Sequence, residues 1–432
     1  KCMTKKKQQW FELEQREDLE HDARSLNATH NVVWGRLGGP ILVNHRPGLL
    51  VSAVRFMLRV IRTPDVAFRT EVKNGRKRAV AASTLSRYFD ILGGMAQVYS
   101  RHCQYSPLLQ LFFDCFTGHD IQRCTLTGPD RQFEDGRRIE AEVFIDFVDT
   151  LREQGARIGI VKKLNDWNNV SDENDRNVQR YVDALFERYP VLVPIYLDLF
   201  SKDCRIEEER VEDAASKVEA ERAADMAALR TSATGEVKSQ EPMEHYDLSG
   251  LIAARDRLLE NMRAKPSIFR SMVGYVWRIE WSYAGFYLRV VFLFDGIAPM
   301  IDAQPADLIG QYWVDAITKG RGTFRHQNSW LWNQPDVDAI APHHVTKRMN
   351  LIHALRRLAR RDRYVCVKAE QKCKRFGMGR QPQKVMSEAA KEARRLRLKR
   401  QAALAPGWVQ TALRGIGNSS SLSGSKGWSM SA

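Results

Sequence analysis

The sequence lacks any apolar run long enough to cross a membrane. Its longest apolar stretches, residues 191–200 and 287–294, are short and contain Asp198 and Arg289. A membrane-spanning helix needs about 20 predominantly apolar residues, so we expect no membrane segment. The first residues are charged and lack the apolar stretch of a secretory signal. These absences predict an intracellular, cytoplasmic protein.

Cysteine is scarce, and its spacing matches no familiar metal site. The 432 residues include seven cysteines, an odd number, with no Cys-x-x-Cys pair, so no disulfide framework is indicated. Cys103, Cys115 and Cys124 lie near His102 and His119 in the sequence. A zinc site is one interpretation of this group, and packing in the core is the other. Core packing is favoured, because a free cysteine usually behaves as a small buried hydrophobe.

Motifs of common enzyme classes are also missing. The chain contains no nucleophile elbow of a serine hydrolase and no glycine-rich dinucleotide fingerprint. The loop KGRG at residues 319–322 lacks the spacing of a phosphate-binding loop. The sequence therefore assigns no reaction by motif alone.

Positive charge is abundant and concentrated in one stretch. The formal net charge is +15, from 67 Lys and Arg against 52 Asp and Glu. Residues 341–400 contain nineteen basic and four acidic residues, a difference equal to the excess of the whole chain. Such a concentration predicts affinity for a polyanion, so we expect a nucleic acid as partner. A solvated basic surface is the alternative, and a membrane surface is disfavoured because the cations of residues 384–405 surround the expected helix.

The pattern along the chain predicts an α+β protein. Residues 1–155 predict a mostly helical N-terminal region of unassigned function. Residues 165–382 predict an antiparallel-sheet domain with flanking helices, interrupted at 201–242 by a charged helical insertion without bulky apolar residues. Residues 383–405 predict a basic helix, and residues 406–432 predict a flexible tail rich in Gly and Ser.

Three strands can be placed within the sheet domain. Residues 191–200 form an apolar run rich in β-branched residues, which predicts a buried strand. Residues 269–281 and 286–294 predict two strands of a hairpin. In the N-terminal region, Asn74-Gly75 at the centre of residues 72–78 indicates the basic tip of another hairpin.

Several stretches of the second half form an ordered set within roughly residues 178–380. They are YVDALF at 181–186, LVPIYLDLF at 192–200, VGYVWRIE at 273–280, GFYLRVVFLFDG at 285–296, IGQYW at 309–313, ITKGRG at 317–322, Tyr364, and KRFG at 374–377. Taken together, these stretches resemble the YagK/YfjJ C-terminal domain family, also called the inovirus gene-two type, which occurs in prophages.

The resemblance implies a domain similar to rolling-circle replication initiators. In those enzymes two histidines on a central strand hold a divalent metal, and a tyrosine attacks the DNA phosphate. This chain has Tyr287 and Arg289 where the histidines would lie. A guanidinium is always protonated and cannot bind a cation. The sequence therefore favours a prophage- or inovirus-type DNA-binding protein that has lost the metal pair.

Two alternative functions stay open. An active nickase would use Tyr364 as nucleophile, expected on a helix one turn before Lys368, with Glu280 and Asp198 as ligands for Mg²⁺. The alternative for Tyr364 is a structural role, in which its side chain packs that helix against the sheet. A non-enzymatic scaffold would instead bind a phage or host replication protein through the charged helix at 201–230.

Arg289 is expected on a strand face opposite Leu288, Val290 and Phe292. That face must be open enough for a guanidinium, which would pair first with Glu280, second with Asp198, or else contact a phosphate. The residues predicted to bind DNA are Arg289, Arg363, Lys368, Lys372, Lys374, Arg375, Arg394, Arg395 and Arg397.

Overall fold

The computed structural model divides the chain into two compact units, Lys1–Gln381 and Pro382–Ala432. The structure describes residues 32–35, 40–42, 48–203, 205, 210–234 (side chains to 230), 247–297, 305–326, 339–369 and 373–382. The predicted helix at 383–405 and the tail at 406–432 therefore lie outside the described residues. Within the described ranges, no helix combines the length and apolar character needed to traverse a bilayer.

The protein is built of both helices and strands, as the sequence predicts. The elements up to residue 188 are β1 (Val32–Trp34), β2 (Pro40–Leu42), α3 (Leu49–Arg62), β3 (Phe68–Lys73), β4 (Arg76–Ala81), η1 (Thr84–Tyr88), α4 (Leu92–Ala96), β5 (Cys103–Tyr105), α5 (Pro107–Thr117), η2 (Asp120–Arg123), α6 (Glu140–Arg157) and α7 (Ile160–Arg188). The later elements are β6 (Leu192–Phe200), α8 (Val211–Thr234), α9 (Leu248–Asn261), α10 (Pro266–Phe269), β7 (Met272–Ser282), β8 (Gly285–Asp295), α11 (Pro305–Tyr312), η4 (Trp313–Ile317), β9 (Thr323–His326), α13 (Val345–Arg360), η5 (Arg361–Arg363), β10 (Val365–Val367) and β11 (Phe376–Met378).

The N-terminal part packs α3, α5 and α6 around aromatic side chains. Phe56 of α3 lies 6.2 Å from Phe112 of α5 and 6.0 Å from Phe144 of α6, ring centre to ring centre. The predicted hairpin is confirmed as β3 and β4, which pair antiparallel. Asn74 and Gly75 have φ values of 53° and 71°. Two successive positive φ angles are typical of a type I′ turn, whose twist matches that of the strands it joins.

The second half is built on one five-stranded sheet with the order β11-β7-β8-β6-β9. Every neighbouring pair is antiparallel. The three strands expected from the sequence are confirmed as β6, β7 and β8, and β8 lies at the centre. The central strands are apolar almost throughout because both faces of the sheet are covered.

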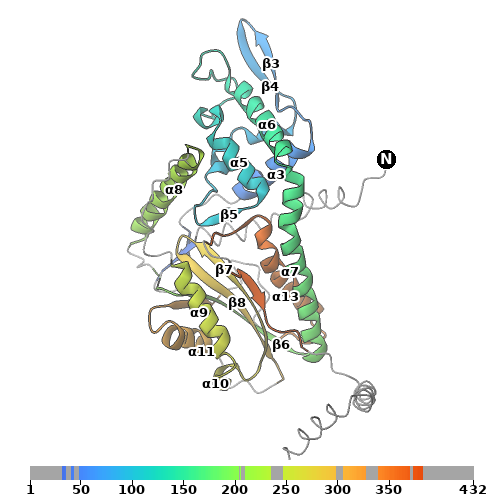
Figure 1. Cartoon of the computed structure of the whole chain (residues 1–432), viewed down its shortest axis with the longest axis vertical. Helices are drawn as coiled ribbons and strands as arrows, with labels where there is room; N and C mark the ends of the chain where they lie inside the picture. Colours follow the sequence, from blue (N-terminus) through green and yellow to red (C-terminus); the bar gives the residue numbers. More distant parts are fainter. Residues whose placement is uncertain are drawn as a thin grey trace, which may run out of the picture. The chain divides into compact units, whose positions relative to one another are not determined.

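Helices lie on both faces of this sheet (Figure 1). On one face, Tyr196, Val276 and Val291 pack with apolar residues of α7 and α13. On the other face, Leu288 and Phe292 share a core with residues of α9 and α11. The predicted alternation along β8 is confirmed. The expectation of an open face around Arg289 is wrong, because α7 and α13 close that side.

Helix α8 differs from the exposed helix expected at 201–230. One side of α8 is buried against the N-terminal part, which includes α5. This buried side carries the small apolar residues Ala214 and Val218, with Leu229 further along. Between them lie two buried acids, Glu221 and Asp225. Sequence reasoning missed this packing because Ala, Val and acids at helical spacing resemble a solvated helix.

Candidate nucleic-acid interface

Arg289 forms a buried, bidentate ion pair with Asp198. Its Nε donates to Oδ1 at 2.8 Å and its Nη2 donates to Oδ2 at 3.0 Å. The two residues are directly opposite each other on β8 and β6. Burial alone would lower the pKa of Arg289, but the carboxylate of Asp198 more than offsets this and raises it. The Arg289 guanidinium is thus held in its charged form, and both side chains are buried.

Glu280 is the centre of a second ion-pair group on the same sheet face. Its Oε1 accepts from Nη1 of Arg361 at 2.6 Å and lies 3.1 Å from Nε of Arg278. Arg278 also pairs with Asp362 through Nη2. The expected pairing of Arg289 with Glu280 is wrong, because in the strand register Arg289 opposes Arg278 and Glu280 opposes Tyr287.

The two groups together contain as many cations as anions. The arginines are Arg278, Arg289 and Arg361, and the acids are Asp198, Glu280 and Asp362. Burying charges is tolerated when each has a partner of good geometry. The charges of these two groups are thus paired, and Arg325 of β9, which opposes Asp198 in the strand register, adds a further cation to the same sheet face.

A divalent metal does not fit this set of side chains. Asp198 and Glu280, the candidate ligands, already accept from guanidinium groups. Tyr287 stacks on Phe200 with ring centres 5.0 Å apart, and burial raises the pKa of its hydroxyl. Over the described ranges, no cluster of three or more His, Cys, Asp or Glu has the geometry of a metal site. A cation here would have to displace buried arginines that carry the same sign of charge.

Tyr364 does not lie on the helix expected for it. It follows the short 3₁₀ turn η5 and directly precedes strand β10, which pairs with β5 of the N-terminal part. Its exposed fraction is 6%, and its carbonyl oxygen accepts from the backbone N–H of Ser106 at 2.9 Å. Lys368 therefore follows a strand and does not lie one helical turn from the phenol. The environment corresponds to the anchoring role that was the alternative for Tyr364.

The described cysteines of the N-terminal part, Cys103, Cys115 and Cys124, have raised pKa values, which favour the neutral thiol. Cys103 and Cys115 are buried among apolar residues. Burial raises the pKa of Cys115 to about 11 and that of Cys124 to about 12. His119 accepts from the backbone N–H of Ile121 through Nδ1 and caps a turn. Thiols of this kind are poor ligands, because a metal binds the thiolate.

Several arginines of the basic stretch form ion pairs or hydrogen bonds with other residues of the protein. Arg356 of α13 donates through Nε and Nη2 to Asp175 of α7, at 2.8 and 2.9 Å. Arg363 pairs with Asp172 of the same helix. Arg375 donates to Oε1 of Gln104 at 3.0 Å. Arg289, Arg363 and Arg375, predicted to bind DNA, thus have protein partners in this structure.

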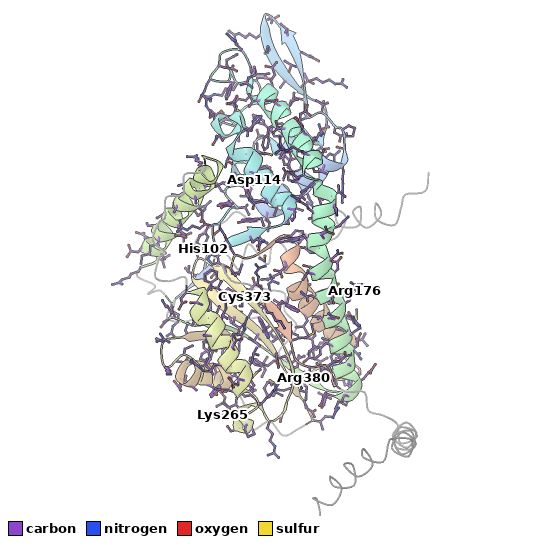
Figure 2. All side chains as sticks on the ribbon, in the orientation of Figure 1. His102, Asp114, Arg176, Lys265, Cys373 and Arg380 are labelled. Atoms are coloured by element: carbon purple, nitrogen blue, oxygen red, sulfur yellow. The ribbon has the colours of Figure 1, made fainter. Side chains whose placement is uncertain are left out.

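Other predicted cations lie at the surface. Lys368 and Lys374 are exposed on either side of residues 370–372, and Arg380 is exposed after β11. In the described parts of the chain, none of these three side chains takes part in an ion pair. Figure 2 places Cys373 and Arg380 at opposite ends of β11, an edge strand of the sheet. Lys372, Arg394, Arg395 and Arg397 lie outside the described residues.

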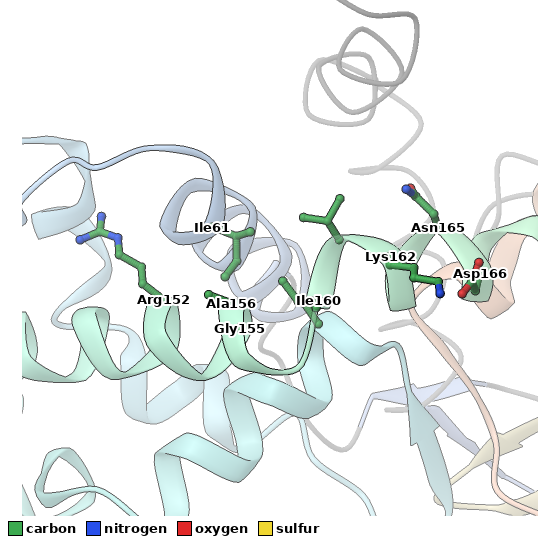
Figure 3. A pocket seen from close by; sticks show the side chains of 10 residues that line it. Ile61, Arg152, Gly155, Ala156, Ile160, Lys162, Asn165 and Asp166 are labelled. Atoms are coloured by element: carbon green, nitrogen blue, oxygen red, sulfur yellow. The ribbon is translucent and has the colours of Figure 1, made fainter.

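A cavity of about 810 Å³ lies where α6 meets α7 (Figure 3). Its most polar wall residue, Arg152, is already bound, because its guanidinium donates to the carbonyl oxygens of Val60, Thr63 and Asp65. Lys162, Asn165 and Asp166 of α7 are the other polar lining residues, and the remaining ones are glycine or apolar.

Comparison of the chain with models of protein families, with curated proteins and with solved structures finds no match.

Proposed function

We propose that this protein binds DNA and is a prophage- or inovirus-type protein related to rolling-circle replication initiators. The observation that carries the proposal is the position of its net charge. All of the +15 excess falls within residues 341–400, and Lys368, Lys374 and Arg380 of that stretch are exposed. Clustered cations give sequence-independent affinity for phosphates. DNA is the polyanion that the resemblance implies.

The structural context of the resembling stretches supports the proposed relationship. The stretches at 192–200, 273–280 and 285–296 coincide with β6, β7 and β8. The stretch at 374–377 leads into β11 of the same sheet, and the one at 181–186 lies on α7, which packs on it. Segments chosen only by their sequence thus belong to one packed body.

The proposal assigns no nicking activity to the protein. Nicking of this kind needs an accessible phenol and a metal beside the scissile phosphate. Tyr364 is buried, and the acids that would bind the metal are paired with arginines. The buried arginines instead replace the positive charge of a metal, which leaves phosphate binding to the exposed cations.

Removal of cations from the basic stretch tests the proposal. In one variant Arg394, Arg395 and Arg397 are changed to Ala; in another, the exposed Lys368, Lys374 and Arg380 are changed to Ala. Each variant should lose about two to three phosphate contacts, and the slope of log affinity against log salt should become shallower by about 0.7–0.9 per contact. The matched control changes Arg263, Lys265 and Arg270, which are exposed and lie outside the basic stretch, and should bind as the unmodified protein does. Equal affinities in all four proteins would contradict the proposal.

A further inference from the structure

The hairpin of β3 and β4 is the most basic exposed element of the described N-terminal part. Residues 68–81 contain five Lys and Arg against one acid, a net charge of +4. Every side chain from residue 69 to residue 78 is exposed. In Figure 1 the hairpin extends beyond the helices that carry it. It buries only Phe68 along its strands, so it adds little to the core.

The strand register separates the side chains of the hairpin into two faces. Phe68, Thr70 and Val72 share one face with Ala79 and Lys77, their neighbours across the strands. On the other face, Arg69, Glu71 and Lys73 lie opposite Val80, Arg78 and Arg76. Four cations therefore share the second face: Arg69, Lys73, Arg76 and Arg78. In the described residues none of these four has an ion pair.

Contacts at its base and next to its turn hold the hairpin in a fixed orientation. Phe68 packs against Phe89 and Phe144 with ring centres 5.8 and 5.9 Å apart. Lys77 donates through Nζ to the carboxylate of Glu142 at 2.9 Å and to the carbonyl oxygen of Arg137 at 3.0 Å. All of these contacts involve the first face. The face with four cations is consequently turned away from the body of the protein.

We infer that the β3–β4 hairpin is an arm that enters the major groove of duplex DNA. A two-stranded β-ribbon fits a major groove about 12 Å wide. Arg69 and Lys73 lie four residues apart on one strand, about 13 Å along it. Arg78 and Arg76 follow the neighbouring strand, so cations line both margins of the ribbon and can reach phosphates on both sides of the groove. The deep, narrow major groove of an RNA duplex would not admit it.

This inference rests on the proposed DNA binding and adds a second contact region to it. The test variant of the full chain changes Arg69, Lys73, Arg76 and Arg78 to Gln, which keeps the long side chains and removes the charge. The control variant changes Lys163, Arg263, Lys265 and Arg270 to Gln, all exposed. Figure 2 places Lys265 at the far end of the sheet from the hairpin. Both variants lose the same net charge.

Fluorescence anisotropy with labelled duplex DNA, single-stranded DNA and duplex RNA of one sequence gives the outcome. At salt concentrations between about 50 and 200 mM, the hairpin variant should bind duplex DNA about tenfold or more weakly than the unmodified protein does. Its affinity for duplex RNA should change by less than about threefold, as should every affinity of the control variant. Methylation of guanine N7, in the major groove, should weaken duplex binding by the unmodified protein but not by the hairpin variant.

Different failures have different meanings. If the hairpin variant binds duplex DNA like the control variant while Arg394, Arg395 and Arg397 matter, the arm is refuted and the proposed function stands. If the hairpin variant loses affinity for duplex RNA equally, groove entry is refuted. If the unmodified protein binds none of the three nucleic acids, the proposed function fails as well. A circular-dichroism melting curve of each variant establishes that it is folded.

Discussion

Arg289 of β8 donates two hydrogen bonds, of 2.8 and 3.0 Å, to the carboxylate of Asp198 on β6. The sheet that contains this pair is covered on both faces. In the proposed relationship to rolling-circle initiators, Arg289 would occupy the position of a metal-binding histidine. The guanidinium places a fixed positive charge there, and both side chains of the pair are buried.

Breaking this pair should destabilise the protein strongly. Asp198→Asn leaves the buried charge of Arg289 without its counter-ion, which should lower the free energy of unfolding by about 3–5 kcal/mol. Replacing both residues, Asp198→Leu with Arg289→Met, should return stability to within about 1–2 kcal/mol of the starting protein. Urea unfolding followed by circular dichroism measures both values. If the double variant loses as much stability as Asp198→Asn or more, the two residues are not coupled.

Local sequence signals predict part of this fold well. Strands β6, β7 and β8 follow from apolar, β-branched runs, and the β3–β4 hairpin follows from Asn74-Gly75. Each of these signals lies within a few residues of the structure it specifies.

Contacts between distant segments could not be predicted in the same way. The partner of Arg289 depends on the register between β6 and β8, which are separated by α8, α9 and β7. The strand after Tyr364 forms because β5, from the N-terminal part, pairs with it. The charge count also treated Arg356 and Arg363 as free, although acids of α7 bind them. Sequence reasoning therefore located the sheet but did not predict that the charged side chains on this face pair with one another and are buried.

Tyr364→Phe should leave any DNA affinity unchanged, within about twofold, because the phenol is buried among apolar residues. The unmodified protein should form no covalent adduct with single-stranded DNA in the presence of Mg²⁺ or Mn²⁺. Denaturing gel electrophoresis with labelled DNA detects such an adduct. An adduct that forms with the unmodified protein and disappears in Tyr364→Phe would establish a nickase and refute this account.

Docking of α8 should depend on pH through Asp225. Burial raises the pKa of this carboxyl from 3.8 to about 6, although the backbone N–H of Arg101 donates to it. The folded state then binds more protons than the unfolded state between about pH 4 and 6, so Asp225 should lower stability as pH rises through that window. Nearby, burial opposes ionisation of Glu221, but the hydrogen bond from His102 and the charge of Arg101 outweigh it and lower the pKa of Glu221. Stabilisation by Glu221 has the opposite pH dependence: it is present above the ordinary pKa of 4.5 and is lost as pH falls through the lowered pKa of Glu221.

Asp225→Asn should remove the contribution of this carboxyl. The free energy of unfolding of the variant minus that of the starting protein should rise by about 1–3 kcal/mol from pH 4 to pH 7.5. Urea unfolding at the two pH values gives the comparison. A constant difference in the free energy of unfolding at both pH values would show that Asp225 is not the titrating group.

The turn of the hairpin should control local rather than global stability. Gly75→Val places a β-branched residue at a φ of 71°, which costs about 1–2 kcal/mol. The global melting temperature should stay nearly constant, because the hairpin buries little. Trypsin should cleave faster after Lys73, Arg76 and Lys77. Gly128→Val, at a glycine without positive φ and with open space around it, is the matched control and should leave these sites protected.

The most direct test of the central claim is the salt dependence of DNA binding by the unmodified full chain. Affinity for labelled DNA is measured at several salt concentrations between about 50 and 200 mM, and log K is plotted against log salt. The account predicts a straight line with a slope of about −3 or steeper, since several cations act together on the phosphates. Absence of binding at the lowest salt, or an affinity that does not change with salt, would contradict it.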